Sequence, residues 1–198
     1  MTFDERELIG GAACLDFVNT LGGVRGGVTE EKLTDYEALL DWSTAAQARA
    51  SPAMRRLREE ASRAPAEARR VYKRAVLLRE ALYDALILSM KGRKPGARDF
   101  KIINDELATA AAQRRLAPIA GGWRLEHEAE GERLDAPLWP VSESAASLLV
   151  SDELARLRQC ASETCGWLFL DRSKNASRRW CDMKGCGNRA KARRFRAG

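Results

Sequence analysis

Histidine, long apolar runs and catalytic motifs are scarce or missing in this sequence. His127 is the only histidine among 198 residues, which excludes a histidine-rich metal site. The longest apolar stretches, such as Leu86 to Leu88, are far too short to span a bilayer. The mark of a secretory signal, a basic N-terminus followed by an apolar segment, is also missing. We therefore expect a cytoplasmic protein without a membrane partner.

The sequence offers little for catalysis. It has no recognisable pair of nucleophile and base, no phosphate-binding loop and no open metal site. His127 shares a period-two pattern with Trp123 and Leu125, so we expect a partly buried structural histidine. Cys14 stands in an apolar segment without a basic neighbour, which indicates a small buried side chain rather than a reactive thiol. These absences predict that the protein is not an enzyme.

Four of the five cysteines are concentrated near the C-terminus, in the pairs Cys160-x4-Cys165 and Cys181-x4-Cys186. In a reducing cytosol, clustered cysteines are more often metal ligands than disulfides. Zn²⁺ binds four thiolates in a tetrahedron, and four protein ligands leave no open position for catalysis. The sequence therefore predicts one structural Zn²⁺ held by these four cysteines. Two disulfides, or buried structural thiols, are the alternatives.

Charge is distributed unevenly along the chain, whose formal net charge is +6. Residues 1–157 contain 23 Lys+Arg and 25 Asp+Glu, whereas residues 158–198 contain 11 Lys+Arg and three acidic residues. Four thiolates around Zn²⁺ carry a net charge of −2 and offset only part of this surplus. A strongly basic segment in an otherwise balanced chain predicts a polyanionic partner, and we expect nucleic acid in the form of duplex DNA.

The basic residues of the last segment are the candidates for phosphate contact. If the chain is helical from about Cys186, then Arg189, Arg193 and Arg196 share one face. A solvated cationic tail is the alternative, and Asn188 and Arg189 could instead hold the segment together by hydrogen bonds. The predicted nucleic-acid-binding residues are Arg178, Arg179, Lys184, Arg189, Lys191, Arg193, Arg194 and Arg196.

Helical periodicity dominates the first 157 residues. The strongest pattern begins at Pro65 and ends at Lys91-Gly92, with apolar residues at steps of three and four. A second helix is expected from Thr34, where Thr34–Glu37 has the form of a capping box. Further helices are expected from Ser51-Pro52, from Gly96 to Leu116, and from a cap at Ser142.

One segment changes to a period of two. Trp123, Leu125 and His127 alternate with charged residues, which predicts a strand, and Gly131 would turn the chain toward a second strand near Arg133 and Leu134. The sequence thus predicts a mainly α-helical domain with a small β-hairpin in residues 1–157. A zinc-stabilised α+β finger follows in residues 158–198, with Trp167, Phe169, Trp180 and Phe195 as its small core.

The cysteine-rich segment resembles the CGNR zinc finger, which is named for the tetrapeptide found here as Cys186–Arg189. The resemblance extends over Cys165–Asp171 and Arg179–Cys181. The preceding part of the chain is similar to the ABATE domain, through Leu15–Leu21 and Leu39–Trp42. The resemblance implies a bacterial transcription regulator that acts in stress responses. It also implies that the zinc ligands are Cys160, Cys165, Cys181 and Cys186.

Asp16 and Asn19 are polar residues inside an apolar segment, so they must be hydrogen-bonded if they are buried. They could lock the N-terminal fold, or they could line a pocket for a small-molecule effector. Our leading hypothesis is DNA binding by the finger, regulated by residues 1–157 through a ligand or through formation of a homodimer. The alternative is that the finger is a protein–protein interaction module that does not bind DNA.

Overall fold

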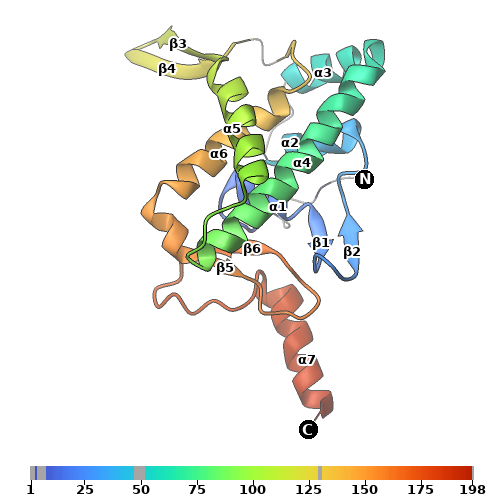
Figure 1. Ribbon diagram of the computed structural model, residues 1–198, viewed down its shortest axis with the longest axis vertical. Coiled ribbons are helices and arrows are strands. Elements are labelled where there is room, and N and C mark those ends of the chain that lie inside the picture. Colours follow the sequence, from blue (N-terminus) through green and yellow to red (C-terminus); the bar gives the residue numbers. More distant parts are fainter. Residues whose placement is uncertain (1–2, 4–7, 47–51, 129–130, 198) are drawn as a thin grey trace.

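The computed structural model describes residues 3, 8–46, 52–128 and 131–197 of the chain. Helix α4 runs diagonally through the middle of the molecule and contacts α1, α2, α3 and α5, while α6 packs on α5 and α1 (Figure 1). These two groups of helices enclose the main hydrophobic core. The helices are α1 (Ala13–Val18), α2 (Tyr36–Ala46), α3 (Pro52–Arg63), α4 (Pro65–Met90), α5 (Ala97–Ala111), α6 (Trp139–Leu149) and α7 (Asn188–Ala197).

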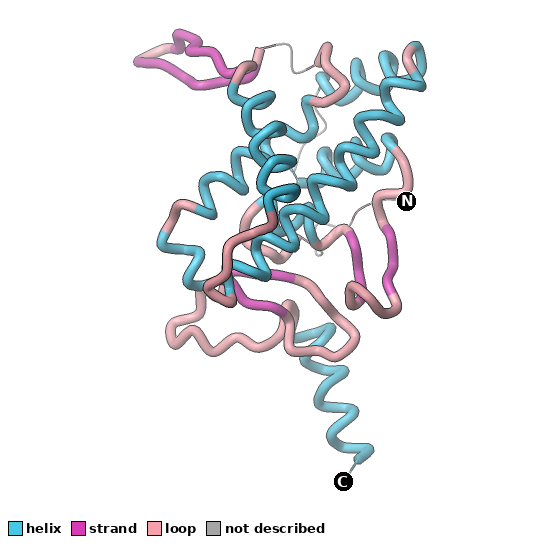
Figure 2. Tube along the Cα trace, viewed as in Figure 1, coloured by secondary structure: helices cyan, strands magenta, loops and turns pink. Residues whose placement is uncertain are grey.

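In the part of the chain that the structure describes, the strands form three separate antiparallel hairpins around these helices (Figure 2). They are β1 (Leu21–Gly23) with β2 (Thr29–Glu31), β3 (Arg114–Ile119) with β4 (Gly122–His127), and β5 (Leu157–Gln159) with β6 (Leu168–Leu170). A mainly helical protein with small hairpins and a cysteine-rich α+β end confirms the predicted fold class. Among the described residues, no helix is both long enough and apolar enough to cross a membrane.

Helix α4 follows the sequence pattern closely. Pro65 occupies its first turn, where a missing backbone N–H costs nothing. Its buried face includes Val71, Leu78 and Leu82. The helix ends at Met90, before Gly92 with a φ of +65°, a left-handed conformation that glycine adopts without strain. The prediction for this helix is confirmed.

Other helix ends differ from the prediction in their capping residues. Helix α2 begins one position later than a Thr34 cap would place it, because Asp35 Oδ1 accepts the backbone N–H of Ala38 at 2.8 Å. Helix α6 begins at Trp139, and the Ser142 hydroxyl, already inside the helix, donates to the carbonyl of Leu138. The cap predicted at Ser51 lies outside the described residues.

The hairpin that contains Trp123 pairs with a different segment from the one predicted. Helix α5 ends at Ala111 rather than Leu116, and β3 follows it as the partner of β4. Gly121, with a φ of +84°, allows the two-residue turn between the two strands. Residues 133–134 are not a strand, since Leu134 is buried in the core and Tyr36 donates to its carbonyl at 2.8 Å.

The main core includes residues from the cysteine-rich end of the chain. Leu157, Leu168 and Leu170 are buried in the same cluster as Leu15 and Phe17 of α1. Strand β6 therefore packs directly on the helical body, and the two segments expected as domains share one core. The division between residues 157 and 158 stays a prediction.

A side-chain clasp and two backbone hydrogen bonds fix β6 and the loop before it in place. Asn19 donates to the carbonyl of Leu168 at 2.9 Å and accepts its N–H at 2.8 Å. The N–H of Leu170 donates to the Gly10 carbonyl at 2.8 Å, and that of Gly166 to the Gly23 carbonyl at 2.7 Å. The N-terminal segments thereby supply hydrogen bonds to β6 in addition to those of its partner strand β5.

We expect Asn19→Ala to lower the free energy of unfolding by about 3 kcal/mol, because the substitution leaves a buried N–H and a buried carbonyl of Leu168 unpaired. Urea unfolding followed by circular dichroism measures this loss. Asn104→Ala is the matched control, since Asn104 is exposed and its change should stay within about 0.5 kcal/mol. Equal losses in the two variants would contradict a clasp at Asn19.

Candidate metal centre and nucleic-acid interface

The four clustered cysteines come from two turns that the local sequence folds tightly. Cys160 follows β5, and its N–H donates to the Trp167 carbonyl at 2.9 Å, while the N–H of Cys165 donates to the Ser162 carbonyl at 3.0 Å. Cys186 lies in the π-helical turn η4 (Met183–Gly187), where Asp182 accepts the N–H of Gly185 at 2.6 Å. Both turns present their sulfurs to a common centre.

The sulfur positions fit one tetrahedral ion. All four Sγ atoms lie within 4.8 Å of one another, with Cys165 and Cys181 at 3.7 Å and Cys181 and Cys186 at 3.6 Å. A zinc ion with Zn–S bonds of about 2.3 Å requires sulfur separations of about 3.8 Å. Disulfides require about 2.05 Å, and all five cysteines are free thiols, so the disulfide alternative is wrong. These donors hold one structural Zn²⁺.

The thiols cannot all ionise together without a cation. Hydrogen bonding to Cys160 raises the pKa of Cys181, and it raises the pKa of Cys165 to about 12. The pKa of Cys160 falls to about 2, because Cys165 and Cys181 donate to its sulfur. The Cys160 thiolate is thus favoured, while Cys165 and Cys181 keep their protons. Zn²⁺ replaces those protons when it binds, so it supplies the charge that four thiolates need.

Two of the eight predicted nucleic-acid-binding residues support the metal centre. Arg189 donates to the Cys186 sulfur at 2.9 Å. Arg178 lies 4.4 Å above the ring of Phe169 and donates to the carbonyls of Trp180 and Cys181. Donors of this kind stabilise the anionic sulfurs and orient the loops that carry them. For Arg189, this contact matches the structural alternative raised from the sequence.

The other six cations are exposed around the metal centre and along α7. This helix projects away from the body of the molecule (Figure 1). A weak contact of 3.4 Å connects Arg193 with the Ser162 hydroxyl. These six residues are Arg179, Lys184, Lys191, Arg193, Arg194 and Arg196; Arg189 is exposed as well, in spite of its contact with Cys186.

The small core of the finger differs from the prediction in one residue. Phe169 is fully buried among the four cysteines, with Trp167 and Trp180 packed partly against them. Phe195 is 90% exposed, because α7 extends beyond the finger into solvent at that point. The expectation that Phe195 belongs to this core is therefore wrong.

A buried carboxylate, not recognised from the sequence as functional, organises the loop between the two cysteine pairs. Asp171 accepts hydrogen bonds from the N–H and hydroxyl of Ser173, at 2.9 and 2.5 Å, and from the N–H of Arg178 at 2.8 Å. The Ser173 hydroxyl and these amides lower its pKa. The Asp171-Arg172-Ser173 sequence is a signal for such a turn, since aspartate often accepts the N–H two residues later.

Asp16 and Asn19, predicted either to lock the fold or to line a pocket, make structural contacts. Both polar atoms of the Asn19 side chain bind Leu168, and Asp16 Oδ1 accepts the N–H of Gly10 at 2.8 Å. Burial raises the pKa of Asp16 to about 6, against the lowering effect of that hydrogen bond. The role in ligand binding stays a prediction.

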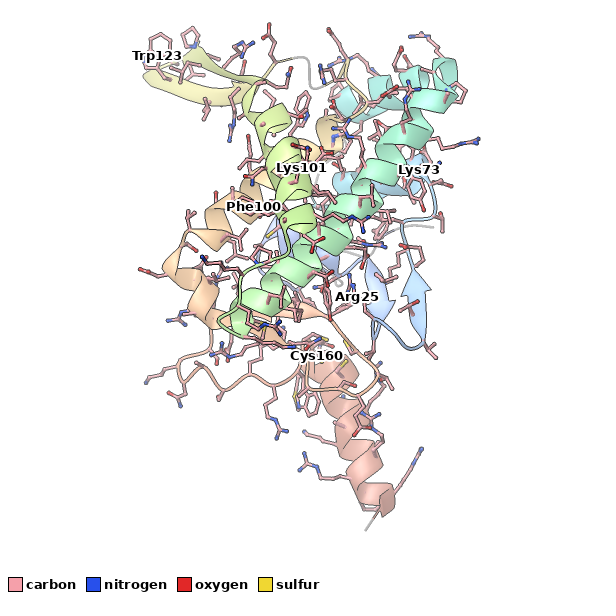
Figure 3. The ribbon with its side chains drawn as sticks, viewed as in Figure 1. Arg25, Lys73, Phe100, Lys101, Trp123 and Cys160 are labelled. Atoms are coloured by element: carbon pink, nitrogen blue, oxygen red, sulfur yellow. The ribbon has the colours of Figure 1, made fainter. Side chains whose placement is uncertain are left out.

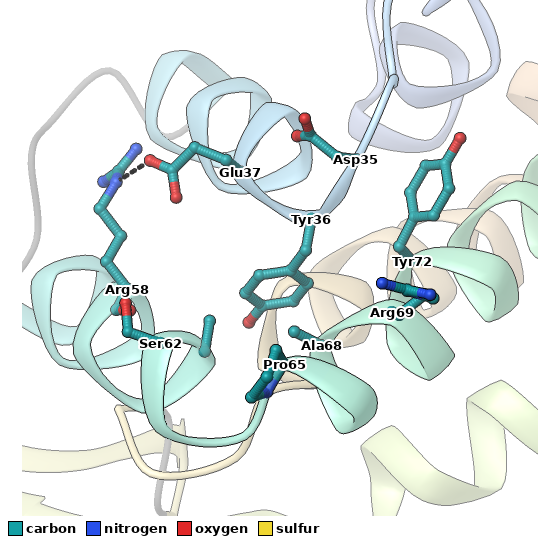
Figure 4. Close-up of a pocket in the computed structure, with 10 residues that line it drawn as sticks. Asp35, Tyr36, Glu37, Arg58, Ser62, Pro65, Ala68, Arg69 and Tyr72 are labelled. Carbon is teal, nitrogen blue, oxygen red and sulfur yellow. Dashed lines mark hydrogen bonds and ion pairs between the residues drawn. The ribbon is translucent and has the colours of Figure 1, made fainter.

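Three cavities lined by described residues exceed 300 Å³, and no lining includes Asp16 or Asn19. One of about 330 Å³ lies between the β1–β2 hairpin and the cysteines, and a third, of about 470 Å³, lies between α4 and α5. The second, of about 320 Å³, lies between α2, α3 and α4 (Figure 4). Most polar groups of the second are already paired: Arg58 with Glu37, Tyr36 with the Leu134 carbonyl, and Tyr72 with the Leu33 carbonyl.

Comparison with known proteins agrees with the geometry. The family model of the ABATE domain, described as "putative stress-induced transcription regulator", matches residues 11–152. The model of the CGNR zinc finger matches residues 156–197, which contain all four clustered cysteines. A search of curated proteins finds no match.

We expect the purified protein to contain one zinc per chain and Cys181→Ser to contain far less. Because the metal centre contacts the main core through β6, the variant should also unfold at a temperature lower by about 10 °C. Elemental analysis and calorimetry measure the two effects. Cys14→Ala is the control: it removes a buried cysteine outside the cluster and should keep its zinc. Folded wild-type protein without bound metal would contradict the assignment.

We expect Asp16→Asn to be more stable than the wild type at pH 7, with a difference that disappears toward pH 4. The folded state binds the Asp16 proton more tightly than the unfolded chain, so ionisation costs stability as the pH rises from 3.8 to about 6. Urea unfolding of both proteins across this range measures the difference in their free energies of unfolding. Both proteins have the same metal centre, so its own pH dependence cancels in this difference. A difference that stays constant with pH would contradict the assignment.

Proposed function

The chain belongs to the ABATE family and ends in a CGNR zinc finger, and from this premise we propose that it is a cytoplasmic transcription regulator whose finger binds duplex DNA. The observation that carries the proposal is α7, a helix that starts at the metal centre and extends freely into solvent with its cations exposed. Ten residues give it a length of about 15 Å, and the major groove of B-DNA, about 12 Å wide, admits a helix of this kind.

The cations divide into two roles under this proposal. Arg178 and Arg189 hold the metal centre, so they position α7 rather than contact DNA. Lys191, Arg193, Arg194 and Arg196 supply contacts along α7, and Arg179 and Lys184 extend the basic surface beside it. Contacts between cations and phosphates are independent of sequence and release counterions, so binding should weaken steeply with salt.

The helical body is the regulatory part in this proposal, through a small-molecule effector or through a homodimer. Its support is the direct contact between body and finger: Asn19 with Leu168, and Gly23 with Gly166. A movement of the β1–β2 hairpin or of α1 would displace residues beside the metal centre through these hydrogen bonds. We propose a binding role rather than an enzymatic one, since four cysteines leave Zn²⁺ no open position.

An interaction with an acidic protein is the second candidate. Phe195, 90% exposed among the cations of α7, is the observation that favours it, because exposed aromatic residues are enriched at protein interfaces. Capture of a partner that survives nuclease treatment would support this candidate over DNA.

We expect the triple variant Arg193→Ala, Arg194→Ala, Arg196→Ala to bind random-sequence duplex DNA at least tenfold more weakly than the wild type. The slope of log K against log salt should fall by about one unit for each lost phosphate contact. Fluorescence anisotropy at about 50 and 200 mM salt measures both quantities.

The matched control removes three exposed cations of α4 at a distance from α7: Arg69→Ala, Arg70→Ala, Lys73→Ala (Figure 3). This variant should bind DNA like the wild type. Equal binding by the α7 variant and the wild type would overturn the proposal, and equal losses in both variants would show a nonspecific effect of net charge.

A further inference from the structure

The β3–β4 hairpin projects from the end of the molecule opposite α7 (Figure 1). The strand register places Leu116 opposite Leu125 and Pro118 opposite Trp123. Because side chains alternate along a strand, these four residues share one face of the hairpin. Trp123 is 70% exposed, Leu116 68% and Leu125 51%. We call this surface the hairpin apolar face.

Ion pairs balance the charges of the hairpin. Arg124 pairs with Glu126 at 2.7 Å on the face opposite the apolar one, and Arg115 pairs with Glu128 at 2.8 Å. Arg114, at the base, pairs with Glu143 of α6. Each arginine of the hairpin thus has its own carboxylate, and a nucleic acid or a strongly charged protein would meet no surplus of charge here.

The base of the hairpin is fixed to the helical body. Both Arg114 and His127 bind the carboxylate of Glu143: Arg114 at 2.6 and 2.7 Å, and His127 Nε2 at 2.9 Å. The His127 ring also lies 5.2 Å from that of Trp139. These contacts hold the hairpin away from the body, with Trp123 near its tip (Figure 3).

A two-stranded hairpin with an uncovered apolar face is marginally stable in water. We propose that the hairpin apolar face packs against the same face of a second copy of this chain. The two hairpins would then form a small sandwich of two sheets about 10 Å apart, related by a two-fold axis. The balanced charges favour this occupant, since two identical neutral surfaces approach without repulsion.

The available area agrees with a weak dimer. Trp123 offers on the order of 150 Å² and each leucine on the order of 100 Å². With Pro118, two copies would bury roughly 800 Å², which is the size of a weak, transient interface. We therefore expect the dimer to form only at micromolar or higher concentrations of the protein. The α7 helices lie at the opposite ends of the two copies and stay free.

Sedimentation of the full-length, zinc-loaded protein from about 1 to about 100 µM tests the proposal. The wild type should shift from 22.0 kDa toward twice that mass as its concentration rises. Trp123→Glu and Leu116→Glu should stay at 22.0 kDa across the range. Ile119→Glu is the matched control, because Ile119 is an exposed apolar residue on the opposite face of the same hairpin.

Zinc content and helical circular dichroism establish that each variant is folded. If the wild-type protein stays at 22.0 kDa at every concentration, the proposal is wrong. A different protein would then be the candidate partner for the hairpin apolar face. Dimers that persist in both Trp123→Glu and Leu116→Glu overturn it as well. DNA binding through α7 is measured separately, so its failure would not change the outcome here.

Discussion

The four cysteine sulfurs lie within 4.8 Å of one another, and four thiolates this close repel one another unless a cation binds between them. Without it, hydrogen bonding among the thiols raises the pKa of Cys165 and Cys181, and the set cannot become a group of four thiolates. With it, two loops and the start of α7 acquire a fixed arrangement that so short a segment could not reach by burying apolar surface. The direction in which α7 leaves the molecule therefore depends on the metal.

The metal centre is also joined to the helical body. Leu168 and Leu170 belong to the main core, while Phe169 between them faces the cysteines, so alternate residues of β6 serve two different clusters. Asn19 and Gly10 complete the hydrogen bonds of this strand from the N-terminal side. A disturbance at the metal centre therefore reaches α1 through a strand of three residues, without any flexible connection.

Sequence patterns predicted the features that depend on residues close together in the chain. The spacing of the cysteines predicted the metal centre, and the apolar period of α4 predicted that helix nearly to the residue. The pairing of β4 was missed, because Leu116 and Pro118 fit the end of a helix as well as a strand when the partner is unknown. The partner of Asn19 lies 149 residues away, and no local pattern contains it. Charge alone grouped Arg178 and Arg189 with the other six cations, and only their hydrogen bonds at the metal centre separate them.

The hydrogen bond between Gly166 and Gly23 limits which substitutions are tolerated where the finger meets the helical body. A Cβ at position 166 would lie 2.8 Å from the Gly23 carbonyl, and one at position 23 would lie 2.1 Å from the Val28 carbonyl. Gly166 thus lets the two main chains meet directly, Gly23 satisfies the steric demand of its own hairpin, and the bond between them carries no ionisable group. Salt concentrations that would release the protein from a polyanion leave this bond unaffected, so the attachment of the finger to the body and the binding of the finger to a charged partner differ in their response to salt.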